Sequence, residues 1–178
     1  DPKTGYTAIF IISANGYFFK PTIIMKGTTS TCLNKIKIID DYDIYKKYTK
    51  SGWIDENILL FLLREIAISI NYHNCTLILD NYSVHKKDII IDVAGSLNIK
   101  LIFVPPNMTP VHQPLDVKIN GPVKSIGKYL SKELFLEEPF STPSLCDSIL
   151  MLIESIKRIK SKTIIDSFVT ACHFKYND

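Results

Sequence analysis

The sequence predicts an α/β fold in which a mixed β-sheet is flanked by helices. Two observations lead to this prediction. The chain opens with two β-rich runs joined by Asn15-Gly16, and Asn-Gly is the strongest short signal for a β-hairpin. Farther on, residues 76–116 alternate short apolar runs with a helical pattern, which is typical of strands connected through a helix.

The opening hairpin is predicted from residue type. Residues 6–13 are rich in β-branched and aromatic side chains, which favour strands. Residues 17–26 should form the partner strand, and Pro21 inside it implies an edge, a bulge or a break. Residues 27–49 are polar and show no clear period. We interpret them as a long connection with one short strand at residues 36–39.

The first helix has a clear start signal. Asp55 is a suitable N-cap, and Glu56 suits the positive end of the helix dipole. Residues 58–70 are apolar nearly all round, which predicts a well-buried helix.

The stretch from Thr76 to Asp116 organises the rest of the chain. The apolar run 77–79 stops at Asp80-Asn81, as a buried strand bounded by a turn would. Residues 100–104 read as a second strand, and Asp116 falls in the first turn of a helix that begins near Pro114. Between the strands a helical stripe is predicted from Ile89, Ile90, Val93 and Leu97.

Helices are predicted for the remaining chain. Gly121-Pro122 should kink or restart the helix that carries Asp116, and residues 123–135 should continue it. Thr142-Pro143 reads as the start of an amphipathic helix. A last short helix is expected at residues 163–172.

Two aspartates are candidates for metal-dependent chemistry. Asp80 at a strand end and Asp116 at a helix start could supply the hard oxygen ligands that Mg²⁺ prefers. Two such ions can activate a water and stabilise charge at phosphorus during phosphodiester cleavage. The alternatives are an Asx-turn between Asp80 and Asn81, and simple pairing of Asp116 with the helix dipole.

Three motifs together resemble the catalytic core of the DDE superfamily endonucleases. They are DNYSVH at 80–85, PPNMT at 105–109 and QPLD at 113–116. The closest branch is that of pogo, Tigger, jerky and centromere protein B, within the Tc1/mariner transposases. The resemblance covers most of the chain. It implies one RNase H-like catalytic domain over residues 1–178, a mixed sheet flanked by helices that lacks its first strand.

The resemblance also implies residue roles. Asp80 and Asp116 match the second and third acids of the family's catalytic set, which bind Mg²⁺ or Mn²⁺. Asn81 and His85 would lie next to the metal-binding carboxylates and orient them without binding the metal themselves. Further along the chain, positively charged side chains would contact DNA, or alternatively form an ordinary solvated helix face: Lys118, Lys124 and Lys128.

The first catalytic acid of the family is not identifiable in this chain, which leaves enzymatic activity open. In the family, this acid lies on a strand that comes before the hairpin. Asp1 is the only acid before the hairpin in this chain, and because it lies at the chain end we assign it no catalytic role. Asp40, Asp41 and Asp43 read as a solvated loop. We therefore expect an N-terminally truncated domain, or one that has lost its first strand.

By resemblance, the leading function is a transposase that cleaves transposon DNA and joins its 3′ end to a target. The alternative is a catalytically inactive, host-adopted module for DNA binding or dimerisation. A third interpretation is an unrelated α/β domain in which the residues of the motifs only form turns. DNA is the expected partner, a homodimer stays open, and neither a membrane nor a small-molecule cofactor is expected.

Composition is compatible with these readings. A net charge of +3 is too small to argue for nucleic acid by itself, and 46% hydrophobic residues fit a globular protein. The sequence has no apolar run long enough to span a membrane and no signal peptide pattern. The four cysteines are widely spread, which suggests reduced thiols in an intracellular, and by resemblance nuclear, protein.

Overall fold

The computed structural model describes residues 5–39, 41–137 and 143–172. The chain divides into two compact units, residues 1–53 with 114–178, and residues 54–113. Each unit has its own sheet, with three strands in the first and two in the second. The expectation of a single domain over residues 1–178 stays a prediction.

The sheet of the first unit contains the expected hairpin. Strand β1 (Tyr6–Ile9) pairs antiparallel with β2 (Thr22–Lys26), and the turn is closed by a 2.9 Å hydrogen bond from the Ser13 N–H to the Tyr17 carbonyl. Both strands are shorter than predicted, and only an isolated bridge between Ile12 and Phe18 continues the pairing. β2 begins directly after Pro21, which has no N–H to donate to the ladder.

The prediction of a strand at residues 36–39 is wrong, because those residues are helical. They end η1 (Ser30–Ile39), a 3₁₀ segment with a kink at Ile36. Ile36 and Ile39 are both fully buried, and residues three apart share one face of a 3₁₀ helix. The third strand is β3 (Tyr45–Thr49), which pairs parallel with β2 and was expected to be connection.

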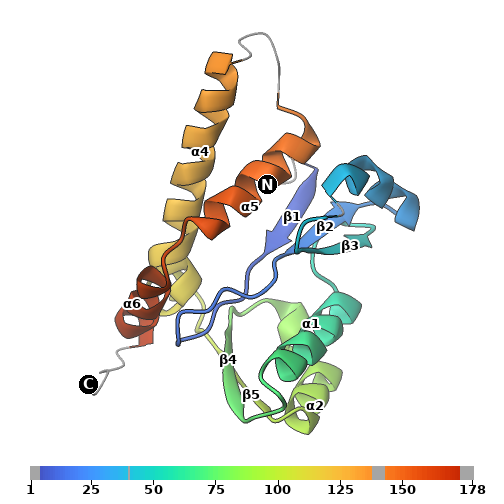
Figure 1. Cartoon of the computed structure of the whole chain (residues 1–178). Helices are drawn as coiled ribbons and strands as arrows, with labels where there is room; N and C mark the ends of the chain where they lie inside the picture. Colours follow the sequence, from blue (N-terminus) through green and yellow to red (C-terminus); the bar gives the residue numbers. More distant parts are fainter. Residues whose placement is uncertain (1–4, 40, 138–142, 173–178) are drawn as a thin grey trace. The chain divides into compact units, whose positions relative to one another are not determined.

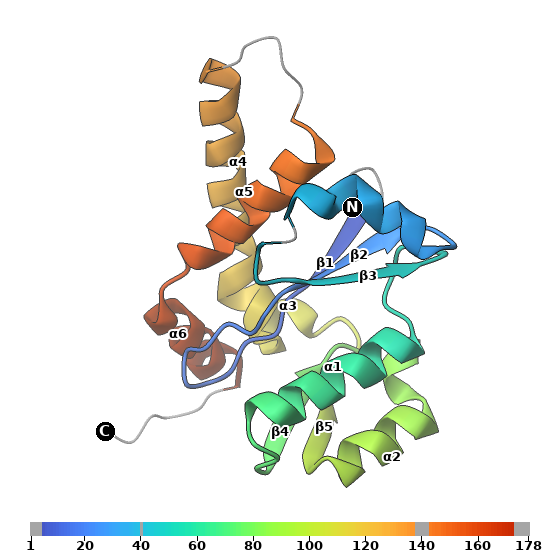
Figure 2. The same cartoon turned by 45° about the vertical axis from the view of Figure 1, so that its right-hand side comes forward.

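One face of this sheet carries the main core of the first unit. Ile23 and Met25 of β2 point to the same face, because alternate residues of a strand do. They pack against η1 and against α5 (Leu145–Lys157), both of which lie along the sheet in Figure 2. The buried members of this cluster are Ile23, Met25, Ile36, Ile39, Ile44, Ile149 and Ile153.

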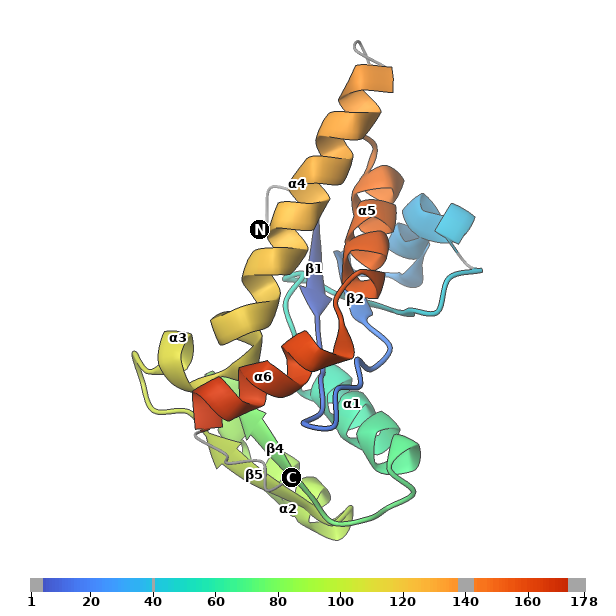
Figure 3. The ribbon, with the colours of Figure 1, turned by 60° about the vertical axis from the view of Figure 1, so that its left-hand side comes forward.

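A second cluster joins the hairpin to the C-terminal helices. The helix that carries Asp116 continues through Gly121-Pro122: the π-helical turn η3 (Leu115–Ile119) leads directly into α4 (Asn120–Glu137), so these two residues do not restart it. α4 runs beside α5, and α6 (Ser161–Cys172) crosses near its lower end in Figure 3. The buried residues of this cluster are Ile119, Val123, Ile156 and Ile164, and Phe10 and Phe18 pack against them.

The second unit is a parallel strand pair with helices on one side (Figure 1). β4 (Cys75–Leu79) pairs with β5 (Ile99–Phe103), as the sequence predicts. α1 (Glu56–Ser69) and α2 (Asp88–Ser96) pack against each other, and the Asp55 carboxylate caps α1 by accepting the Ile58 N–H at 2.9 Å. The short helices are η2 (Ser83–Lys86) and α3 (Thr109–His112).

The predicted stripe on α2 is only partly correct. Ile90 is fully buried, whereas Ile89 is 46% exposed. The buried face instead combines Ile90 with Ala94, four residues later. With mixed and parallel sheets and flanking helices, the architecture is the RNase H-like α/β fold that the resemblance implies.

α5 begins two residues after Pro143. The predicted cap Thr142 lies outside the described residues. Ser144 caps the helix through a reciprocal pair of hydrogen bonds: its hydroxyl accepts the Asp147 N–H, and the Asp147 carboxylate accepts the Ser144 N–H. Hydrogen bonding of the carboxylate to the Ser144 side chain, and to the Ser144 backbone N–H, holds the pKa of the Asp147 carboxyl below its ordinary value of 3.8.

We predict that Gly16→Ala destabilises the chain by about 1–3 kcal/mol in urea denaturation. Gly16 has φ +89°, and an added Cβ would lie 3.0 Å from both Ser161 Cβ and the Ser161 carbonyl oxygen. Gly95→Ala is the control, because a Cβ there meets nothing within 4 Å and alanine favours helices. Equal stabilities of the two variants would contradict this account of the turn.

We predict that Ser144→Ala raises the Asp147 pKa toward 3.8, as measured by NMR pH titration. It should also cost about 1 kcal/mol at neutral pH. Since the folded-state pKa is lowered, the stabilisation is present above the unfolded pKa and is lost as pH falls through the folded value. The stability difference should therefore shrink below about pH 4. Ser125→Ala, on the exposed side of α4, should show neither effect.

Candidate functional site

Asp80 stands at the carboxyl end of the parallel strand pair. β4 ends at Leu79, whose carbonyl accepts the Val104 N–H at 2.8 Å. This bond, just past the end of β5, ties the end of β4 to its neighbour. Asp80 therefore follows a strand end that is held in place, on the edge where ligands bind in open α/β sheets.

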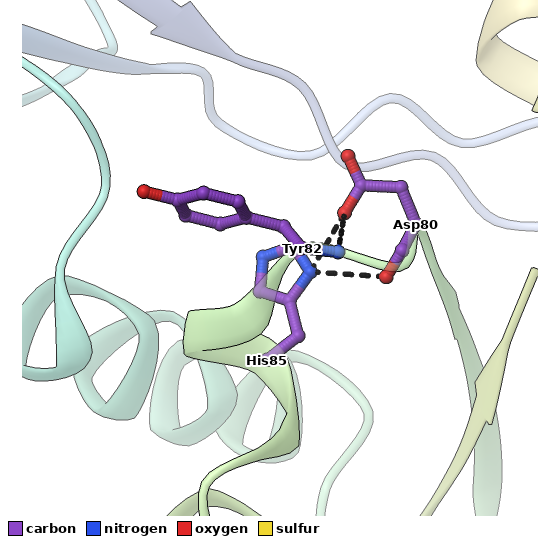
Figure 4. Close-up of polar contacts among 3 residues, drawn as sticks. All are labelled: Asp80, Tyr82 and His85. Atoms are coloured by element: carbon purple, nitrogen blue, oxygen red, sulfur yellow. Dashed lines mark hydrogen bonds and ion pairs between the residues drawn. The ribbon is translucent and has the colours of Figure 1, made fainter. Parts of the chain in front are cut away.

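Both polar contacts of the Asp80 carboxylate use the same oxygen (Figure 4). Oδ1 accepts the Tyr82 N–H at 3.2 Å and lies 2.8 Å from His85 Nδ1. The bond to Tyr82 is the Asx-turn foreseen as the structural alternative at this position. Oδ2 makes no hydrogen bond or ion pair with any residue that the structure describes, so the turn leaves one oxygen for another partner.

His85 faces this carboxylate from η2. Its side chain is only 10% exposed, so the imidazole is buried against the turn. Nδ1 lies 3.3 Å from the Asp80 carbonyl oxygen as well as close to Oδ1, and both are acceptors. Nδ1 therefore carries the proton and donates it toward Asp80.

Tyr82 completes the turn. Its carbonyl accepts the His85 N–H at 3.0 Å, and its ring lies edge-on to the imidazole with centroids 5.6 Å apart. Tyr82 was not predicted from the sequence, although it lies two residues after an aspartate, which is the position that an Asx-turn uses. Asn81, between them, is half-buried and forms no hydrogen bond within the described chain.

Asp116 lies in the other unit, in the first turn of η3. It is exposed, and its Oδ1 accepts a 2.8 Å hydrogen bond from Asn120 Nδ2. Asn120 was also missed, although the i, i+4 spacing on a helix could have indicated the contact. The second carboxylate oxygen of Asp116 has no partner among residues 5–39, 41–137 and 143–172.

The two acids fit divalent metal ions in donor chemistry. Each presents a solvent-accessible carboxylate oxygen, and hard oxygen donors are what Mg²⁺ and Mn²⁺ bind. Within the described part of the chain, no group of three or more His, Cys, Asp or Glu residues is gathered as a metal site. His85 Nδ1 contacts the Asp80 carboxylate, and residues that hydrogen-bond to a metal ligand in this way commonly orient it.

The candidate DNA-contacting lysines lie on neighbouring turns. Lys118 is half-buried on η3, whereas Lys124 and Lys128 are exposed on α4. Lys124 and Lys128 are four residues apart and so share a helix face. None of the three forms an ion pair with another described residue. This geometry is compatible both with a solvated helix face and with phosphate contacts.

The two acids of the long connection that the structure describes lie in solvent, as expected. Asp41 and Asp43 are exposed, and Asp43 forms a 2.9 Å ion pair with Lys20. Asp1 and Asp40 lie outside the described residues. No helix in the described part of the chain is long and apolar enough to cross a membrane.

A comparison with protein families matches the chain from residue 5 to residue 168. The matching family is described as DDE superfamily endonuclease. No curated protein and no solved structure matches the chain. The matched region includes Asp80, Asp116 and residues of both compact units, so all three motifs lie within it. The interpretation as an unrelated α/β domain is thereby excluded.

We predict that His85→Ala lowers the free energy of unfolding by about 1–3 kcal/mol, because it removes a buried donor to the Asp80 carboxylate. His73→Ala is the control: His73 is exposed in the same unit, and its loss should change stability by less than about 0.5 kcal/mol. Urea denaturation checks both. If His85→Ala were as stable as the wild type, the contact with Asp80 would not help to hold the turn.

Proposed function

Since the chain belongs to the DDE superfamily endonucleases, we propose that it is the catalytic domain of a DNA transposase. Endonucleases of this family act on DNA and generally depend on divalent metal ions. The proposed reaction is metal-dependent cleavage of transposon DNA followed by strand transfer, in the nucleus. The pogo/Tigger branch is the proposed subfamily, on the motifs DNYSVH, PPNMT and QPLD.

The arrangement of Asp80 is the observation that supports this proposal most. Two donors, the Tyr82 N–H and His85 Nδ1–H, hold the same carboxylate oxygen. Rotation of the carboxylate is therefore restricted, and Oδ2 has a defined direction. A carboxylate held in this way loses little conformational entropy when it binds a metal ion, because its orientation is already set.

Asp80 and Asp116 are the proposed ligands of Mg²⁺ or Mn²⁺. When bound, the metal would activate the attacking water or hydroxyl and stabilise charge at phosphorus. His85 is a positioning residue in this proposal, since it acts through Asp80, and Asn120 is the equivalent residue for Asp116. Asn81 is placed beside the turn without a ligand role of its own.

The proposed DNA contacts lie on the helix that follows Asp116. Lys124 and Lys128 are exposed cations on one face of α4, and Lys118 precedes Lys124 by less than two turns. Lysines so arranged neutralise phosphates irrespective of base sequence, and release of counterions favours such binding. The contacts would position DNA without selecting a target.

We predict that Asp80→Asn weakens Mn²⁺ binding at least about tenfold in isothermal titration calorimetry. The substitution keeps an oxygen that can accept the Tyr82 N–H but removes the charge that attracts the cation. Asp92→Asn is the matched control, because Asp92 is an exposed acid on α2 in the same unit and should bind no metal. Equal heats for the wild type and Asp80→Asn would refute the role of Asp80.

Nicking of supercoiled plasmid separates this function from its alternative. The transposase domain should nick DNA in the presence of Mn²⁺, and the Asp80→Asn and Asp116→Asn variants should not. A catalytically inactive, host-adopted module, monomeric or dimeric, would bind DNA and leave the plasmid intact in all three proteins.

A further inference from the structure

The turn after β3 displays the single tryptophan of the chain on a fixed backbone. The Trp53 side chain is 47% exposed. The Thr49 hydroxyl donates to the Trp53 carbonyl at 2.9 Å and accepts the Gly52 N–H at 2.9 Å. The Ser51 hydroxyl accepts the Trp53 N–H at 3.2 Å. The backbone is thus bonded on both sides of the exposed indole.

This turn packs against the end of β2. Gly52 has φ +79°, and a Cβ there would lie 3.1 Å from the Cβ of Lys26. Lys26 is also the register partner of Thr49, and the Gly27 N–H donates to the Thr49 carbonyl at 2.9 Å. Lys26 therefore stands beside the turn that carries Trp53, within the same compact unit.

Two lysines lie close to Trp53 in the fold. Lys26 ends β2, and Lys50 lies within the turn, between Thr49 and Ser51. Both lysines are exposed, and neither side chain forms a hydrogen bond or an ion pair with another residue that the structure describes. The surface therefore combines one exposed indole with two ammonium groups that are not neutralised by acids of the described chain.

We propose that Trp53, Lys26 and Lys50 form a binding surface for unpaired DNA, with a base stacked on the indole and phosphates held by the lysines. Stacking on an aromatic side chain beside basic groups is how proteins hold single strands without sequence preference. Only an unpaired nucleotide offers the free face of its base, so duplex DNA fits this surface less well. The inference rests on the proposed function only in taking DNA as the substrate.

The fluorescence of Trp53 tests this surface directly, because no other tryptophan contributes to the signal. The full chain carrying Asp80→Asn is titrated with oligothymidylate in EDTA, so that no cleavage can occur. Saturable quenching is expected, with weaker quenching by a duplex of equal length. Unchanged fluorescence with oligonucleotide bound, as shown by the anisotropy of a labelled strand, would overturn the proposal, and so would an absence of binding.

Variants test each part of the surface by the same anisotropy measurement. Trp53→Ala should weaken binding by about 5- to 150-fold, the range expected for loss of one stacked base, and Trp53→Phe should retain most of the affinity. Lys26→Gln and Lys50→Gln should each reduce the slope of log K against log salt by about 0.7. Equal slopes in the wild type and both lysine variants would overturn the phosphate contacts. This test does not depend on whether the Trp53→Ala variant folds.

Tyr48→Ala is the matched control. Tyr48 is 39% exposed on β3, but it precedes Thr49 and so points to the sheet face opposite Lys26. Its loss should leave binding unchanged, and an equal loss in Tyr48→Ala and Trp53→Ala would overturn the proposal. A chain that nicks plasmid but shows no Trp53 response keeps the proposed function and loses this surface. A chain that binds DNA through Trp53 but does not nick plasmid keeps this surface and loses the proposed function.

Discussion

The parallel pairing of β4 with β5 is the constraint on which the candidate site depends. Parallel neighbours need a crossover connection, and α2 supplies it between the two strands. The pairing reaches the end of β4, where the Val104 N–H bonds to the Leu79 carbonyl. Asp80 is the next residue, so the residue with the proposed metal chemistry directly follows a strand end that is held by a backbone hydrogen bond.

The chain then uses local hydrogen bonds to orient that residue. The Asx-turn through Tyr82 and the imidazole of His85 act on a single oxygen of Asp80. The structural and the catalytic interpretations of Asp80 are therefore compatible, since the turn engages Oδ1 and leaves Oδ2 accessible. Asp116 is arranged similarly, in a different unit and with different secondary structure: Asn120 donates to its Oδ1, and no described residue contacts its other carboxylate oxygen.

The first unit separates its packing face from its charged edge. The face of β2 that carries Ile23 and Met25 is covered by η1 and α5. The strand beside it, β3, is the half-buried edge of the sheet, and its lysines Lys46 and Lys47 are the kind of residue that discourages an edge strand from pairing with other chains. The turn that displays Trp53 is a direct continuation of this edge.

Local chemistry made much of the fold predictable. Asn15-Gly16, the Asp55 cap and the apolar run before Asp80 each act through neighbours in the chain, and each was assigned correctly. The errors arose where packing decided. Residues 36–39 were read as a strand because isoleucine favours strands, but burial of Ile36 and Ile39 on one side favours a 3₁₀ helix. β3 was missed because its lysines conceal the alternation of a strand.

The sequence alone determined the family and the ends of the elements that carry Asp80 and Asp116, because motifs and turn signals are local in the chain. Only the tertiary structure decided that His85 is buried against Asp80, that Ile90 rather than Ile89 faces the interior, and that Lys26 lies beside Trp53. These outcomes depend on which surfaces meet. Contacts between residues distant in the chain are set by packing, which a pattern of neighbouring residues does not encode.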